Sequence, residues 1–242
     1  MTAIEQIRNA QRAKLVDKDG KPVGLELAPA LEAHQIESLE EDVGQPLPGE
    51  LRSILSICSG IDGCLDGIDF TGRDMAFAKK EVFPHGIPIA RDGFGNFWVL
   101  DLTPQTTASA PVFFACHDAP VILYQSNDIA TFLAEVFRMN KPPYQSLVEE
   151  VQGDSLYNVW RRNPGVVEQS TAAASPDSEL RTFALALPGH FQIVDLRDAT
   201  PGMGFSWGRY GPRTEVRRHG YERIFGYAAP PKTGLFTKLF GR

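Results

Sequence analysis

The chain has few cysteines and no long apolar run. Its 242 residues include three cysteines, Cys58, Cys64 and Cys116, an odd number with no CxxC spacing. We therefore expect buried apolar thiols rather than a disulfide or metal ligands. No window approaches the ~20 apolar residues that a membrane-spanning helix needs. The first residues, MTAIEQIRNAQRAK, are polar where an export signal needs an apolar run, so we expect a cytoplasmic protein without stable membrane insertion.

Motifs for catalysis, cofactors and metals are also missing from the sequence. The five histidines are scattered, and none is paired with another His or Cys at zinc-ligand spacing. Gly93-Phe94-Gly95 leads into a strand-like run, whereas a phosphate-binding glycine loop must open a helix. Neither a GxSxG elbow nor a Walker-type lysine loop occurs. We therefore predict no catalytic residue, no cofactor and no metal site.

Cys116, His117 and Asp118 place a thiol, an imidazole and a carboxylate in a row. Nucleophilic catalysis needs such groups to converge in space, each within hydrogen-bond reach of the next. Adjacent strand residues point to opposite faces, so these three neighbours are poorly placed to converge. We predict that Cys116 is a core residue and that His117 and Asp118 form a turn.

Basic residues are scarce in most of the chain. The net charge of −6 divides into −12 for residues 1–196 and +6 for residues 197–242. A chain that is acidic over most of its length is a poor generic nucleic-acid binder, so we predict no nucleic-acid partner. The acidity suits a basic protein partner, although solubility is a simpler explanation for it. The Gly- and Asp-rich segment 59–75 carries four aspartates against Arg73, and we predict it to be a loop with a locally negative surface.

Hydrophobic periodicity predicts the main elements of residues 1–150. Helices are predicted at 4–15, 30–43, about 51–58, 126–137 and 146–162, and a short strand at 23–27. Gly44 stands where a helix-ending glycine is expected. Residues 89–124 are predicted to form three strands joined by turns. Within them, Val112–Cys116 is apolar on both faces and therefore belongs in the middle of a sheet.

The remaining part of the chain is predicted to be rich in strands. Residues 163–179 are small, polar and contain proline, which is typical of a linker. Strands are predicted at 183–187, 191–196, 204–210, 214–218 and 222–227, the first two as a hairpin. We divide the chain at about residue 150 and expect residues 151–242 to form a linker helix and a small extension packed on the first unit. The basic amphipathic tail, 232–242, is expected to dock on the protein or fray.

Four stretches in a fixed order resemble a known family. They are VGQPLPGELRSILSICSG at 43–60, PIARDGFGNFWVLDL at 88–102, PVFFACHDAP at 111–120 and SNDIATFLAEVF at 126–137. Their order and spacing resemble the SUKH superfamily, which includes the yeast cell-wall assembly regulator Smi/Knr and many bacterial immunity proteins. The resemblance covers about residues 30–140. Where the family often has Asn-Gly-Gly after the Leu-Pro helix, this chain has Cys58-Ser59-Gly60.

The resemblance implies an α+β fold, with helices against a curved, mainly antiparallel sheet, and a protein-binding role without catalysis. Bacterial members neutralise toxins by binding them, so the leading hypothesis is an immunity protein with a basic toxin domain as its partner. Candidate contact residues are Asp62, Asp66, Asp69, Asp74, Asp92, Asn96, His117 and Asp118. A regulatory or scaffold protein with an endogenous partner is the second hypothesis, and an enzyme with a site between the two units is the third.

Overall fold

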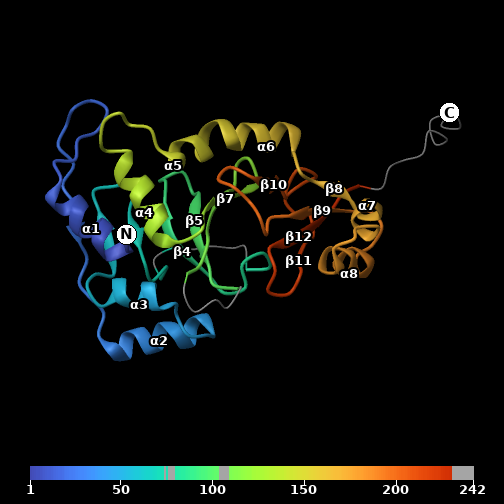
Figure 1. Ribbon diagram of the computed structural model, residues 1–242, viewed down its shortest axis with the longest axis horizontal. Helices are drawn as coiled ribbons and strands as arrows, with labels where there is room; N and C mark the ends of the chain where they lie inside the picture. Colours follow the sequence, from blue (N-terminus) through green and yellow to red (C-terminus); the bar gives the residue numbers. More distant parts are fainter. Residues whose placement is uncertain (74, 76–79, 104–108, 231–242) are drawn as a thin grey trace, which may run out of the picture.

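The computed structural model describes residues 1–73, 75, 80–103 and 109–230, and Asp74 and the tail 232–242 lie outside them. Figure 1 shows α1–α4 gathered at one end of the molecule and α7 and α8 at the other, with two sheets between them. The larger sheet has eight strands in the order β1-β2-β3-β4-β5-β6-β7-β10, and the smaller has four in the order β11-β12-β9-β8. All the strand pairings are antiparallel. The predicted α+β fold with a mainly antiparallel sheet is confirmed.

The elements have the following bounds. The helices are α1 (Ala3–Arg12), α2 (Ala33–Val43), α3 (Gly49–Leu55), α4 (Ile129–Arg138), α5 (Leu147–Glu150), the π-helix η1 (Val151–Ser155), α6 (Leu156–Arg162), α7 (Gln169–Ala173) and α8 (Ser178–Ala186). The strands of the larger sheet are β1 (Glu26–Leu27), β2 (Gly60–Asp62), β3 (Ile68–Asp69), β4 (Gly86–Arg91), β5 (Phe97–Asp101), β6 (Val112–Cys116), β7 (Val121–Ser126) and β10 (Gly204–Ser206). The smaller sheet has β8 (Val167–Glu168), β9 (Phe191–Asp195), β11 (Val216–Arg218) and β12 (Ile224–Ala228).

Local sequence signals explain where the N-terminal helices begin and end. The Thr2 side chain accepts a hydrogen bond from the Glu5 amide at the start of α1, and the Glu5 carboxylate reaches back to the Thr2 amide. The Asp128 carboxylate accepts from the Thr131 amide in the same way at α4. Gly44 ends α2 in the left-handed conformation, with φ 79°, as predicted. These caps satisfy backbone groups that the helix itself leaves unpaired.

The middle strands of the larger sheet are buried on both faces. On one face, Trp98 and Phe114 lie against α4, with the Trp98 and Phe132 rings 5.9 Å apart. On the other face, Phe113 and Tyr124 pack with residues from the C-terminal part of the chain. The prediction that Val112–Cys116 lies in the middle of a sheet is therefore confirmed, and the second face needs the C-terminal residues as its cover.

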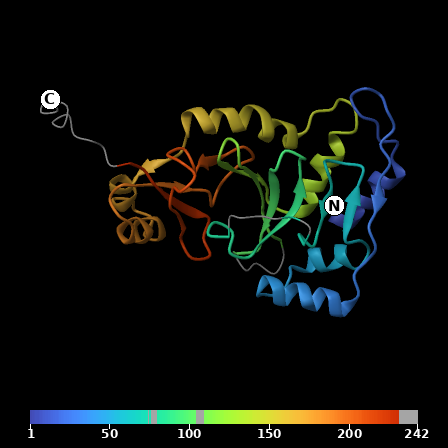
Figure 2. The ribbon, with the colours of Figure 1, turned by 180° about the vertical axis from the view of Figure 1, so that it is seen from behind.

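The C-terminal part adds directly to the larger sheet. Strand β10 pairs with β7, with Phe205 opposite Ile122. The Phe205 ring also stacks on Phe225 of the smaller sheet at 5.3 Å. Figure 2, the reverse view, shows the smaller sheet and α7–α8 at the end of the molecule away from α1 and α2. The proposed boundary near residue 150 stays a prediction.

Four segments differ from their predicted structure. Segment 59–75 contains the β2–β3 hairpin, and four strands rather than three surround the turns between 86 and 126 because β4 precedes Asp92-Gly93. The predicted linker 163–179 contains β8 and α7. Residues 183–186 of the predicted strand belong to α8 and Leu187 is its C-cap; the buried Phe183, Ala184 and Leu187 recur at helical rather than alternating spacing. The predicted strands at 191–196, 204–210, 214–218 and 222–227 correspond to β9, β10, β11 and β12.

The described helices include none with the length and apolar composition that crossing a membrane requires. The three cysteines are buried and free, as predicted.

Candidate partner-binding surface

Three loops that carry most of the candidate contact residues lie at the same end of the larger sheet. In an antiparallel meander successive turns alternate between the two ends of the sheet. The β2–β3 loop, the β4–β5 turn and the β6–β7 turn therefore share one end. We call this end the turn surface and define it by Asp66, Asp92, Phe94, Asn96, His117 and Asp118.

The β4–β5 turn is organised by the carboxylate of Asp92. One oxygen, Oδ1, accepts from the backbone amides of Phe94 and Asn96 at 3.0 and 3.2 Å. The other, Oδ2, accepts from the Asn96 side-chain amide at 2.7 Å and from Gln152 of η1 at 3.3 Å. Gly93 and Gly95 take positive φ angles of 73° and 85°, which glycine adopts without strain. Asp92 therefore holds the shape of the turn.

The β6–β7 turn is joined to the β4–β5 turn through Asn96. The Asn96 Oδ1 accepts from the His117 backbone amide at 3.0 Å and lies 3.2 Å from the His117 Nδ1. On its other side, the His117 Nε2 lies 3.0 Å from the Asp118 Oδ1. Both His117 and Asp118 are exposed, and they form a turn as predicted. Burial raises the pKa of the neighbouring Cys116 thiol, which is the opposite of what activates a cysteine nucleophile.

The β2–β3 hairpin extends the turn surface with more negative charge. Asp62, Asp66, Asp69 and Arg91 all line a shallow cavity of about 240 Å³. The Arg91 Nε lies 3.5 Å from the Asp66 Oδ2, while Asp69 accepts from the amide and the hydroxyl of Thr71. Glu26 stands directly opposite Asp62 across the β1–β2 pair, and both are exposed. Three aspartates and one arginine leave the cavity negatively charged.

The seven described candidate residues thus lie in two adjoining groups, and Asp66 belongs to both. Its backbone amide donates to the Arg91 carbonyl. Its carboxylate lies beside Gly93 of the β4–β5 turn, 3.2 Å from the position that a Cβ atom on this residue would occupy. The eighth candidate, Asp74, lies outside the described residues. Among the described residues, no group of three or more His, Cys, Asp and Glu side chains is arranged to hold a metal ion.

Sequence reasoning missed Phe94 on this surface. Its side chain is 79% exposed at the tip of the β4–β5 turn, between the two glycines. The signal that was available is an aromatic residue inside a Gly-rich turn, where no core position exists for it.

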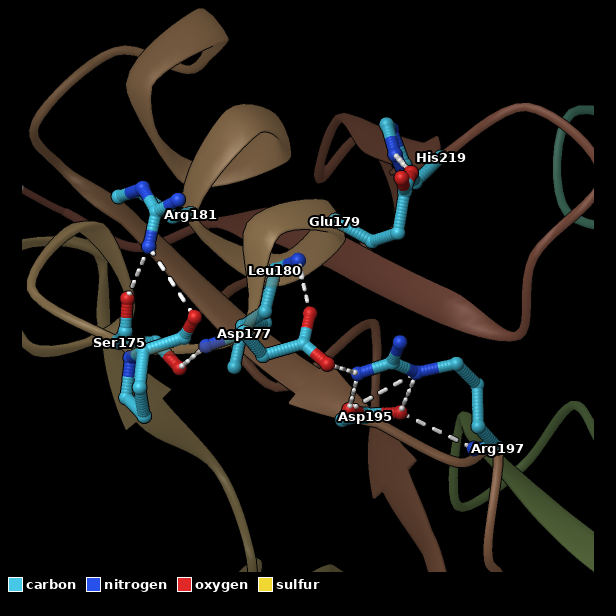
Figure 3. Close-up of polar contacts among 9 residues, drawn as sticks. Ser175, Asp177, Glu179, Leu180, Arg181, Asp195, Arg197 and His219 are labelled. Carbon is cyan, nitrogen blue, oxygen red and sulfur yellow. Dashed lines mark hydrogen bonds and ion pairs between the residues drawn. The ribbon is translucent and has the colours of Figure 1, made fainter.

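A second cluster of charged residues lies in the C-terminal part of the chain, and its charges are paired (Figure 3). Arg197 bonds both carboxylate oxygens of Asp195 and lies 3.0 Å from Asp177, the N-cap of α8. A backbone hydrogen bond from Leu180 and the contact with Arg197 lower the pKa of Asp177. The Glu179 carboxylate lies 2.9 Å from the His219 Nε2. These contacts fasten α8 to β9 and to the β11–β12 hairpin, so we assign them a structural role.

Comparison with known families identifies the part of the chain that contains the turn surface. The SMI1 / KNR4 family (SUKH-1) matches residues 30–135, from the start of α2 into α4. Searches of curated proteins and of solved structures found no match. Residues 30–135 therefore match the SMI1 / KNR4 family (SUKH-1), and the resemblance over about residues 30–140 is confirmed. The strands β8–β12 lie outside the matched range.

Proposed function

We propose that this chain is a non-catalytic, immunity-type protein that neutralises a basic toxin domain by binding it at the turn surface and the adjoining acidic cavity. The observation that carries the proposal is the convergence of three loops from the family-matched region on one acidic end of the sheet. The family is one of protein-interaction domains, with roles in immunity and at the cell wall.

The electrostatics of this end support a basic partner. The side chains of Asp66 and Asp118 are exposed, with Arg91 3.5 Å from Asp66 and His117 3.0 Å from Asp118. Complementary charge of this kind speeds encounter and selects the partner, while well-packed apolar contacts supply most of the affinity. A basic domain would therefore approach exposed carboxylates, which need to lose little of their bound water at the encounter stage.

Two observations favour binding over catalysis. Burial raises the pKa of Cys58 to about 11 and that of Cys64 to about 12, so these thiols are held in their unreactive form at neutral pH. The space between the two sheets, where an enzyme site was considered, is filled by a core that includes Phe113, Phe205 and Phe225. We propose that this interface is structural.

A regulatory or scaffold protein is the second candidate, because the family description also names SMI1 and KNR4. Such a protein would use the same surface for an endogenous partner. A toxin gene beside the gene for this chain favours the immunity function, and a housekeeping neighbourhood favours regulation.

The test is binding kinetics with basic toxin domains encoded beside the gene. Asp62→Lys/Asp66→Lys reverses charge on the acidic cavity, and Asp19→Lys/Glu41→Lys makes the same charge change at two other exposed sites. Glu41 lies on α2, whose end is joined to His85 before the start of β4, away from the β4–β5 turn. We expect the first variant to slow association at least tenfold in low salt and the control to change it much less. Equal effects, or no binding by the unmodified chain, would overturn the proposal.

A further inference from the structure

We propose that Phe94 is the anchor of the partner interface and that it inserts into an apolar pocket rimmed by Lys or Arg side chains on the partner protein. This inference rests on the proposed function and specifies the chemistry of the partner at the same surface. It is carried by the unusual placement of one aromatic side chain, and the surrounding acidic residues determine only the charge expected around the partner's pocket.

Phe94 is presented to solvent although the protein has two aromatic-rich cores. The other described phenylalanines are buried, except for the half-buried Phe97 at the start of β5. Phe94 is 79% exposed, more than any other large hydrophobic side chain in the described part of the chain. A phenylalanine side chain gains a favourable free energy when its apolar surface leaves water, and Phe94 gains almost none of this within the monomer. A partner that covers it would recover that free energy.

The turn that carries Phe94 is held in one shape before binding. The Phe94 amide itself donates to the Asp92 Oδ1, and Asn96 fixes the other end of the turn to both Asp92 and His117. Gln152, from the helical segment after α5, adds a contact to Asp92. Ordering a flexible loop at an interface costs free energy, and a turn that is already ordered avoids most of that cost. Rigid, exposed aromatic side chains are typical interface anchors.

The neighbours of the turn define the rim of the partner's pocket. Asp66 lies beside Gly93 on one side of the turn. His117 lies beside Gly95 on the other, and its neighbour Asp118 has a side chain that is 79% exposed. A pocket that receives Phe94 would therefore place its edges near these two carboxylates. Lys or Arg at those edges would be attracted to them, whereas Asp or Glu would be repelled.

The inference is tested first by site-specific photocrosslinking. Benzoylphenylalanine replaces Phe94 in the full chain, or Leu185 in a control chain. Leu185 is a 67% exposed side chain on α8, outside the family-matched region. Both proteins are irradiated in lysate of the native host, and the adducts are identified by mass spectrometry. We expect an adduct at position 94, but not at 185, with a protein that carries a basic surface.

That protein is then produced by itself and its binding kinetics are measured with the unmodified chain, Phe94→Ala, Phe94→Leu and Leu185→Ala. We expect Phe94→Ala to weaken binding about 30-fold or more, mainly through faster dissociation. Phe94→Leu should recover part of the loss, and Leu185→Ala should change binding less than threefold. Thermal unfolding is expected to be unchanged in all three variants because both positions are exposed.

The outcomes separate this inference from the proposed function. A basic partner that binds Phe94→Ala as tightly as the unmodified chain would overturn the anchor and leave the proposed function standing. An adduct at 94 whose contacting surface is acidic, or no adduct at 94, would also overturn the anchor. If, in addition, the charge-reversed chain binds every basic toxin domain as fast as the unmodified chain, the proposed function fails as well.

Discussion

The Arg218 guanidinium and the Asp101 carboxylate form a two-point ion pair between the two sheets. The Nη1–Oδ1 and Nη2–Oδ2 distances are 3.0 and 2.9 Å, and the side chains are 2% and 0% exposed. Arg218 also donates to the Val82 carbonyl at 3.0 Å. A pair this deeply buried leaves an uncompensated charge when one partner is removed.

We therefore predict that Arg218→Met lowers the free energy of unfolding by about 3–5 kcal/mol. The matched control is Arg217→Met, since Arg217 is the preceding residue and its ion pair with Glu215 is exposed. The control should cost about 1 kcal/mol or less. Urea unfolding followed by circular dichroism measures both. Similar losses for the two variants would show that the buried pair is not important for stability.

The β-meander and its turns were predictable because they depend on local signals. Gly93, Gly95 and Asp92 determine a turn by backbone conformation and by side-chain bonds to nearby amides. The apolar character of Val112–Cys116 likewise predicts a strand buried on both faces. His117 was a predicted contact residue because it belongs to one of these turns, and Asp66 because it belongs to the acidic loop 62–74.

Other features depend on residues far apart in the chain and leave little local trace. The Phe-Ala-Leu-Ala-Leu run at 183–187 alternates in size as a strand would, yet Asp177 caps a helix there and Arg197 holds the cap from another element. Gln152 reaches Asp92 across 60 residues, and Arg218 reaches Asp101 across 117. Periodicity within a short window contains no information about such contacts.

The carboxylate of Asp92 is predicted to keep Phe94 in its binding position. Asp92→Ala removes the acceptor of four hydrogen bonds, and we expect a loss of roughly 2 kcal/mol in stability. The amides of Phe94 and Asn96 should exchange with solvent at least tenfold faster. Asp118→Ala is the control, because its carboxylate lies beside His117 in the neighbouring turn. Unchanged exchange at both amides in Asp92→Ala would mean that the backbone alone holds the turn.

Asp177 is predicted to contribute to stability above its own pKa and to lose this contribution in acid. Its pKa is lowered in the folded protein by the Leu180 amide and by Arg197. A lowered pKa means that the folded state favours the charged form, so the contribution is present above the ordinary value of about 3.9 and is lost as the pH falls through the folded value. Asp177→Asn keeps an N-cap acceptor but removes the charge.

The measurement is the unfolding free energy of the unmodified chain and Asp177→Asn between pH 2.5 and 7. We expect the difference between them to be largest near neutral pH and to shrink below about pH 4. Asp198→Asn is the control, since it removes the charge of an exposed aspartate that directly follows Arg197. A difference that stays constant over the whole range would show that the charge of Asp177 does not matter.

The proposed boundary near residue 150 leads to a prediction about the first unit alone. Residues 1–150 would keep the whole family-matched region but would lose β10 and the cover over Phe113, Ile122 and Tyr124. Exposure of these apolar side chains favours association and loosens packing. We expect residues 1–150 to melt at least 10 °C lower than the full chain and to bind a hydrophobic dye, while residues 1–230 behave like the full chain.

If residues 1–150 instead stay monomeric with an unchanged melting temperature, the C-terminal strands are an accessory layer. The turn surface would then lose the hydrogen bond from Gln152 to Asp92, while the hydrogen bonds among Asp92, Asn96 and His117 all lie within residues 1–150.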